Sequence, residues 1–227
     1  MKNQYFGDFG DYQKFSLLKI LRDVGGLKIA VHWMKTADDL SSDGNKIKYL
    51  ENVGVWRKYD EGVFDFLKGH VAARRRDLRL YERSSHASGI RFINDHIEDP
   101  SRRLAMLVAI AKDKESDLIF FDPDNGIEVA STNKKTLHKY VLWSDMEAAL
   151  SSGKSVLVYQ HFSRQNREAF IKGKKQELQK RFPKAEVVSV RVRNSVYFFL
   201  CREKDLASIR KALGSYAAIW REHTAVS

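Results

Sequence analysis

The feature that most constrains the fold is a wholly apolar run at residues 118–121, which begins after Asp117 and stops at Asp122. A run of strand length without polar alternation is typical of a strand covered on both faces. Residues 27–34 (LKIAVHWM) and 155–161 (SVLVYQH) have the same character. Strands of this kind occur in sheets with helices on both sides, so the sequence predicts an α/β fold.

Helical segments are predicted between these strands. They cover residues 12–22, 60–74, the stretch after Asp99-Pro100, 144–150, 164–182 and 205–213. The signals between residues 77 and 96 are mixed, and one or both of residues 78–81 and 90–93 are candidate strands. Alternation of strands and helices predicts a Rossmann-like, mostly parallel sheet.

The end of the chain is more particular. Residues 186–192 and 196–201, separated by Asn194-Ser195, predict an antiparallel hairpin. An α/β series that ends in such a hairpin resembles the class I methyltransferase fold, in which the last strand inserts antiparallel. A helix and a loose tail are expected to follow. Because 227 residues without a linker suit one large core, a single domain over residues 1–227 is predicted.

The charge balance bears on the partner. The chain has 40 Lys and Arg against 29 Asp and Glu, a formal net charge of +11. Clustered basic side chains release counterions from phosphates, so RNA or DNA is the expected partner, and a merely solvated basic surface is the alternative. The clusters are Arg74-Arg75-Arg76 with Arg79 and Arg83, Lys134-Lys135, residues 172–175, and Arg191 with Arg193.

The compartment is expected to be the cytoplasm. No apolar stretch approaches the roughly 20 residues that span a bilayer, so no membrane span is predicted. The first residues lack the apolar core of a signal peptide, and the single Cys201 has no internal disulfide partner. P-loop, zinc-ligand and dinucleotide fingerprints are absent from the sequence.

A candidate site follows the apolar run, in the segment Asp122-Pro123-Asp124-Asn125-Gly126. In open α/β sheets, ligands bind beyond the carboxyl ends of the strands. Asp122, Asp124 and Asn125 are therefore candidate catalytic residues. The alternative is a plain tight turn, because Pro, Asp, Asn and Gly are the commonest turn formers.

Two short segments resemble a family. Gly7, Asp11 and Lys14 match in type and spacing the N-terminal signature of the adenine-N6 methyltransferases of large-subunit ribosomal RNA, and Asp122-Pro123 matches the first half of their aspartate-proline-proline-tyrosine signature. The resemblance implies S-adenosylmethionine as cofactor and a lysine near the methyl donor. It also implies a cofactor site that includes Gly7, Asp8, Asp11, Lys14 and Pro123.

The chain departs from that family at two places. Asp124 and Asn125 replace the second proline and the tyrosine, and residues 31–38 after the first strand contain no glycine where a glycine-rich cofactor loop is expected. The chain also resembles an uncharacterised bacterial family that shares the aspartate-proline-aspartate-asparagine-glycine turn, a likeness that implies no activity.

His161 is a further candidate. It ends the strand at residues 155–161, whose carboxyl end should adjoin the Asp122 turn. It is predicted to act as a general base, a metal ligand or a phosphate contact, with a simple strand-capping role as the alternative. For Lys14, the alternative to a catalytic role is a surface ion pair with Asp11, three residues earlier.

Three hypotheses for the function follow. The first is a methyltransferase-like protein that uses S-adenosylmethionine on nucleic acid, in which Asp122 accepts a hydrogen bond from the target amine. The second is a nuclease or phosphohydrolase in which Asp122, Asp124 and Glu128 bind Mg²⁺ or Mn²⁺ and His161 activates water. The third is a non-catalytic nucleic-acid-binding protein on a degenerate methyltransferase fold.

Overall fold

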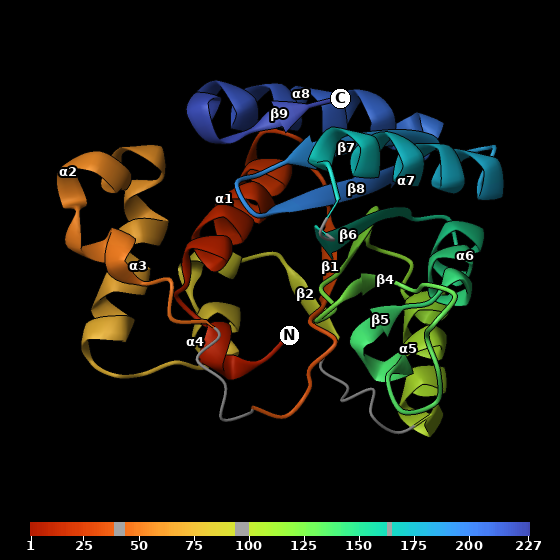
Figure 1. Ribbon diagram of the computed structural model, residues 1–227, viewed down its shortest axis with the longest axis horizontal. Coiled ribbons are helices and arrows are strands. Elements are labelled where there is room, and N and C mark those ends of the chain that lie inside the picture. Colours follow the sequence, from red (N-terminus) through yellow and green to blue (C-terminus); the bar gives the residue numbers. More distant parts are fainter. Residues whose placement is uncertain (39–43, 94–99, 163–164) are drawn as a thin grey trace.

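The computed structural model describes residues 1–38, 44–93, 100–162 and 165–227. Within them, seven strands form one sheet in the order β2-β1-β3-β6-β8-β7-β9 (Figure 1). The strands are β1 (Ile29–His32), β2 (Arg91–Ile93), β3 (Leu118–Phe121), β6 (Ser155–His161), β7 (Glu186–Arg191), β8 (Ser195–Cys201) and β9 (Ala225–Val226). Two further strands, β4 (Gly126–Ile127) and β5 (Tyr140–Val141), pair with each other.

The strand directions confirm the predicted hairpin. β2, β1, β3 and β6 run parallel, whereas β8 is antiparallel to both β6 and β7. β8, the last long strand, therefore lies inserted between β6 and β7, as in the arrangement that the sequence predicts. This insertion brings the first residue of β8 to the same edge as the last residue of β6, because His161 pairs with Ser195.

Helices cover both faces of the sheet, also as predicted. They are α1 (Phe9–Asp23), α2 (Val53–Trp56), α3 (Glu61–Ala72), α4 (Leu78–Glu82), α5 (Pro100–Lys112), α6 (Trp143–Ser151), α7 (Arg167–Arg181) and α8 (Glu203–Ile219). Short 3-10 helices span Asn3–Tyr5, Lys48–Glu51, Arg57–Tyr59, Ser85–Ala87, Leu137–Lys139 and Arg221–His223.

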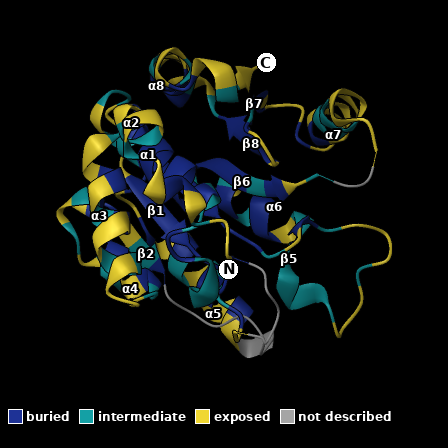
Figure 2. Cartoon of the chain, turned by 60° about the vertical axis from the view of Figure 1, so that its left-hand side comes forward, coloured by how far each residue is buried: buried dark blue, intermediate teal, exposed yellow. Residues whose placement is uncertain are grey.

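Alternate side chains of each central strand pack into two separate apolar cores, one on each face of the sheet. In β3, Leu118 and Phe120 pack with α1, α3, α4 and α8, while Ile119 and Phe121 pack with α5, α6 and α7. Figure 2 shows the result: the central strands are buried, and the helices expose their outer faces. Period-two alternation between two covered faces explains why the strands read as unbroken apolar runs.

Two local predictions need correction. Residues 78–81, a candidate strand, lie in helix α4, which Asp77 caps by accepting a hydrogen bond from the Arg79 backbone. The tail expected to be loose instead forms β9, which pairs antiparallel with β7. Strand β2 lies in the other candidate stretch. Both predictions rested on short local patterns, whereas a short segment takes much of its structure from neighbours that are distant in sequence.

Among the described residues, no helix is both long enough and apolar enough to cross a bilayer.

Candidate active site

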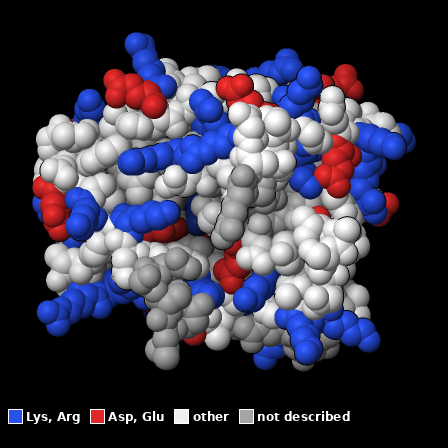
Figure 3. Space-filling model, in the orientation of Figure 1, with Lys and Arg blue, Asp and Glu red and all other residues white. Residues whose placement is uncertain are grey.

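A cavity of about 790 Å³ opens at the carboxyl ends of the parallel strands. Its walls come from the N-terminal residues, α1, the segment before Lys48–Glu51, the turn after β3, the end of β6 and the β7–β8 hairpin. Figure 3 shows acidic side chains within a recess near the middle of this face and Lys and Arg around it. The cavity thus lies where the fold predicts a ligand site.

The N-terminal signature is built around the start of α1. The carboxylate of Asp8 caps the helix by accepting a hydrogen bond from the Asp11 backbone N–H at 2.9 Å. Asp11 in turn accepts one from the Gly7 backbone N–H at 3.3 Å. Gly7 has a φ of +83°, and a Cβ there would lie 2.5 Å from the Val71 side chain, so only glycine fits. The turn therefore places both carboxylates at the cavity wall.

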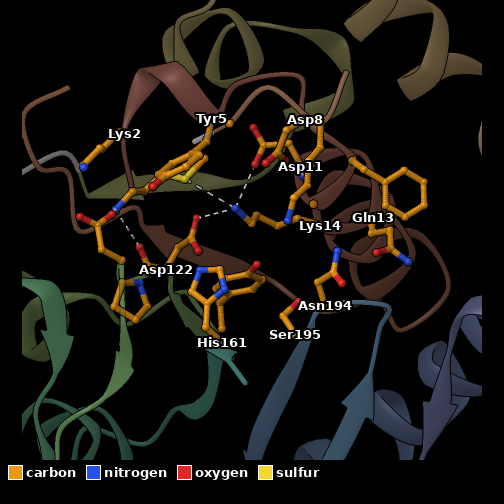
Figure 4. Close-up of a pocket in the computed structure, with 18 of the residues that line it drawn as sticks. Lys2, Tyr5, Asp8, Asp11, Gln13, Lys14, Asp122, His161, Asn194 and Ser195 are labelled. Atoms are coloured by element: carbon orange, nitrogen blue, oxygen red, sulfur yellow. Dashed lines mark hydrogen bonds and ion pairs between the residues drawn. The ribbon is translucent and has the colours of Figure 1, made fainter. Parts of the chain in front are cut away.

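Lys14 joins the two halves of the predicted site (Figure 4). Its Nζ lies 2.7 Å from Asp122 Oδ2 and 3.0 Å from Asp11 Oδ1, and 5.1 Å from the ring centre of Tyr159. Although burial lowers the pKa of Lys14, the charges of Asp11 and Asp122 raise it above the ordinary lysine value. Lys14 is therefore a fixed buried cation, not the surface ion pair that was the alternative.

Two carboxylates near Lys14 have raised pKa values. Burial raises the pKa of Asp11 to about 7, against the lowering effect of the Lys14 charge. Burial also raises the pKa of Asp8. Two neighbouring carboxylates with raised pKa values at the wall of a cavity favour a functional site.

The Asp122 turn is held from several sides. The backbone N–H of Asp122 donates to the His32 carbonyl at 3.0 Å, and its Oδ2 is the oxygen that contacts Lys14. Asp124 accepts a hydrogen bond from the Thr36 hydroxyl at 2.6 Å and lies 2.6 Å from the α-amino group of Met1. Although burial raises the pKa of Asp124, the Met1 charge and the Thr36 hydrogen bond lower it overall.

The segment after β1, which contains no glycine, is held by contacts with the N-terminal residue. Met34 adopts a φ of +48°, a backbone region that non-glycine residues seldom occupy. Its carbonyl accepts a hydrogen bond from the Met1 α-amino group at 3.1 Å, and the Thr36 N–H donates to the Met1 carbonyl at 3.1 Å. The N-terminal residue therefore packs over the end of β1, beside Asp124.

Gln160 fixes the conformation of the turn. Its Oε1 accepts from the Ile127 backbone at 2.8 Å, and its Nε2 donates to the carbonyls of Asn125 at 3.2 Å and His161 at 2.8 Å. Gly126, with a φ of +107°, lies against this amide, and a Cβ there would be 2.3 Å from Gln160 Oε1. Gln160 thus couples the turn after β3 to the end of β6.

Gly126→Ala should lower the free energy of unfolding by about 1–3 kcal/mol, because the backbone is strained for alanine and the methyl group displaces the Gln160 amide. Urea unfolding would measure it. Gly173→Ala is the matched control: Gly173 lies in α7 with open space around it, so alanine should be neutral or stabilise by up to about 1 kcal/mol. Equal effects of the two substitutions would contradict the proposed close approach.

Glu128 lies apart from the acidic cluster. Its Oε1 accepts a hydrogen bond from the Trp143 backbone at 2.5 Å, at the start of α6. Among the described residues, no group of three or more His, Cys, Asp or Glu side chains is placed to hold a metal ion. The set Asp122, Asp124 and Glu128 that the metal hypothesis requires is therefore not assembled here.

His161 lines the cavity, as its position at the end of β6 predicts. Its ring packs edge-on against Tyr159, with ring centres 4.9 Å apart. Burial lowers the pKa of His161, against the raising effect of the Asp122 charge. The ring is therefore largely neutral at pH 7, the protonation state that a general base needs.

Several cavity residues were missed from the sequence. Of the candidate site residues, Gly7 does not line the cavity, whereas the others do: Asp8, Asp11, Lys14, Asp122, Pro123, Asp124, Asn125 and His161. The additional lining residues include Tyr5, Gln13, Lys46, Lys139, Tyr159, Asn194 and Ser195. Tyr5 and Tyr159 bring aromatic rings to a site where the acidic turn has none. Lys139 is close to the acidic turn, because its backbone carbonyl accepts a hydrogen bond from the Asn125 N–H at 2.9 Å.

One basic cluster needs reinterpretation. The Arg76 guanidinium donates to the backbone carbonyls of Phe6 at 2.7 Å and Gly44 at 2.6 Å, which ties two cavity-wall segments together. Arg74 and Arg75 are exposed. Replacing all three arginines would therefore disturb the structure as well as the surface charge, so only Arg74 and Arg75 are candidates for phosphate contacts.

Comparison with known proteins identifies no family for the chain. No protein-family model and no curated protein matches the chain. Among solved structures, the chain is similar to human methyltransferase-like protein 13 in complex with SAH, with 12% identity, 92% of each chain covered and a TM-score of 0.39. The strand order, with β8 inserted antiparallel, is the deciding observation. The fold is methyltransferase-like. Because one fold can host many activities, cofactor and substrate depend on the residues of the site.

Proposed function

We propose that this protein is an S-adenosylmethionine-dependent methyltransferase that acts on nucleic acid. The observation that carries the proposal is the contact between Lys14 and Asp122, which lie 108 residues apart. It joins the two segments that resemble ribosomal RNA adenine-N6 methyltransferases at the wall of one cavity. Neither segment alone distinguishes a site from a turn or a helix start, whereas their meeting at the carboxyl edge of the sheet favours a site.

The cavity side chains suit S-adenosylmethionine in size and charge. A volume of about 790 Å³ is within the range of small-molecule sites. The cofactor carries an ammonium and a sulfonium group, for which the carboxylates of Asp8 and Asp11 are complementary, and a carboxylate that suits a lysine. When bound, it would supply an electrophilic methyl group. The backbone and α-amino group of Met1 contact Met34 and Thr36 at the end of β1. We therefore infer that the cofactor is held mainly from the α1 side.

The remaining side chains suit a nucleic-acid amine as acceptor. Lys46 and Lys139 line the cavity and Lys134 and Lys135 are exposed on the segment between β4 and β5, where they suit phosphates. Among the described residues, no donor contacts Asp122 Oδ1, so that oxygen remains for a hydrogen bond from a target amine. Neutral His161 is the candidate to accept the proton released on methylation.

The proposal predicts stabilisation by the cofactor. S-adenosylmethionine or its demethylated product, far above its dissociation constant, should raise the melting temperature by about 2 °C or more, because a ligand that binds only the native state stabilises it. Differential scanning fluorimetry would measure it. If neither compound shifts cofactor-stripped protein, the proposal is wrong.

Asp8→Asn sharpens this experiment. Asparagine preserves the helix cap but removes the charge, so the variant should fold and lose most of the shift. Asp77→Asn makes the same change at the cap of α4, outside the cavity, and should keep the shift of the parent protein. Equal shifts in the two variants would exclude Asp8 from the cofactor site.

A further inference from the structure

One buried polar group in the cavity wall is left without a partner. The side chain of Gln13, on α1, is 2% exposed and lines the cavity. Its Nε2 has no hydrogen-bond acceptor among the described residues. Buried polar groups are nearly always hydrogen-bonded, so an amide in this state calls for a ligand.

Gln160 provides an internal comparison. Gln160 lies on β6, the strand next to β3, and its amide makes three hydrogen bonds to backbone groups. The buried amide of Gln160 is therefore satisfied by the protein itself, and its role is structural. Among the described residues, the Gln13 amide nitrogen supports no neighbouring element in this way. The contact that Gln13 makes with α8 uses its backbone carbonyl, which accepts from the Tyr216 hydroxyl at 3.3 Å.

The surroundings of Gln13 indicate what kind of group would bind. Asn194 and Ser195, from the β7–β8 hairpin, lie on the same side of the cavity as Gln13 (Figure 4). These three side chains are uncharged and each offers both donors and acceptors. The charged groups Asp11, Lys14 and Asp122 lie toward the middle of the view. This side therefore suits a neutral hydrogen-bonding edge better than a phosphate or an ion.

We propose that Gln13, with Asn194 and Ser195 beside it, forms a subsite that reads the edge of a nucleobase in single-stranded nucleic acid. The proposal rests on the proposed nucleic-acid substrate and specifies how that substrate is selected. Glutamine amides pair with base edges through a donor and an acceptor at once. Because the subsite lies within a cavity, the base must leave any duplex to reach it.

The test compares single-stranded RNA 12-mers of A, C and U and one of mixed sequence by fluorescence anisotropy. The parent protein should bind one homopolymer in preference. Gln13→Met, which keeps the volume but removes the amide, should weaken that binding about tenfold or more and level the preference, as loss of a two-point base contact does. Gln13→Glu, which offers acceptors only, should change the order of preference.

Three controls separate recognition from structure. Gln179→Met makes the same change on α7, outside the cavity, and should leave binding unaltered. Lys139→Ala should weaken all four oligomers alike and lower the salt dependence, as loss of a phosphate contact does. Gln13→Met should not lower the melting temperature, because its amide nitrogen has no bond to lose.

The outcomes are distinct from those of the cofactor experiment. Base preference that disappears in Gln13→Met supports the subsite, even if S-adenosylmethionine fails to bind. Equal binding of all four oligomers by parent and variant overturns the subsite and leaves the proposed methyl transfer standing. A fall in both melting temperature and binding in Gln13→Met, or no binding of any oligomer by the parent, also overturns it.

Discussion

Lys14→Met should lower the free energy of unfolding by about 3–5 kcal/mol, the range measured when one partner of a buried ion pair is removed. The ammonium group neutralises two carboxylates, at 3.0 Å from Asp11 and 2.7 Å from Asp122, and all three side chains are nearly inaccessible to water. Without it, each carboxylate must remain charged in a poorly solvated position or bind a proton. Chemical denaturation at pH 7 would measure the loss.

The control for Lys14 lies on the same helix. Lys19 contacts Asp60 at 3.0 Å but its side chain is 34% exposed, so Lys19→Met should have an effect below about 1 kcal/mol. A second variant, Lys14→Met with Asp11→Asn, should recover part of the lost stability because one uncompensated charge is removed. If Lys14→Met lowers the free energy of unfolding no more than Lys19→Met does, the contacts of Lys14 with Asp11 and Asp122 do not stabilise the fold as proposed.

The pH profile provides an independent readout. Because burial raises the pKa of Asp11 from 3.8 to about 7, the folded state binds its proton more tightly than the unfolded state does. The stabilisation from this group is complete below pH 3.8 and is lost as pH rises toward 7. In Lys14→Met the lowering effect of the ammonium is absent, so the loss should extend to higher pH than in the parent protein.

Arg103→Met should be about as destabilising, again by about 3–5 kcal/mol. The buried Arg103 guanidinium forms an ion pair with the buried Asp145 and donates to the carbonyls of Leu137 at 3.0 Å and Tyr140 at 3.1 Å. It therefore holds the segment before β5 against α5 and α6. Burial raises the pKa of Asp145, and the Arg103 charge opposes that rise, so methionine would leave a carboxylate in an apolar setting.

Arg102 is the matched control for this prediction. It precedes Arg103 in α5 and is exposed, so Arg102→Met should change stability by no more than about 0.5 kcal/mol. Guanidinium unfolding of the two variants in parallel would compare them. Since Lys139 lies in the segment that Arg103 holds, Arg103→Met should also weaken nucleic-acid binding. Similar stabilities of the two variants would refute a structural role for the Arg103–Asp145 pair.

The sequence by itself determined most of the α/β framework. Apolar runs such as residues 118–121 and 155–161 identify strands covered on both faces, because alternation between two cores leaves no polar position. The hairpin at the end and the acidic turn at the strand end are equally local signals. Gly7, Asp11 and Lys14 were selected as site candidates by their resemblance to a family signature, which is a short local pattern.

Tertiary structure alone decided how those residues are used. Lys14 contacts Asp122 only because the strand order places the turn after β3 against α1. Arg76 points inward to the backbone, Glu128 turns away to cap α6, and Gln13 is left without an acceptor. Each of these contacts depends on a partner many residues away. The local sequence around a carboxylate, guanidinium or amide is the same whether or not that group has a hydrogen-bond partner in the folded chain. The assignment of each polar group therefore required the folded arrangement of the chain.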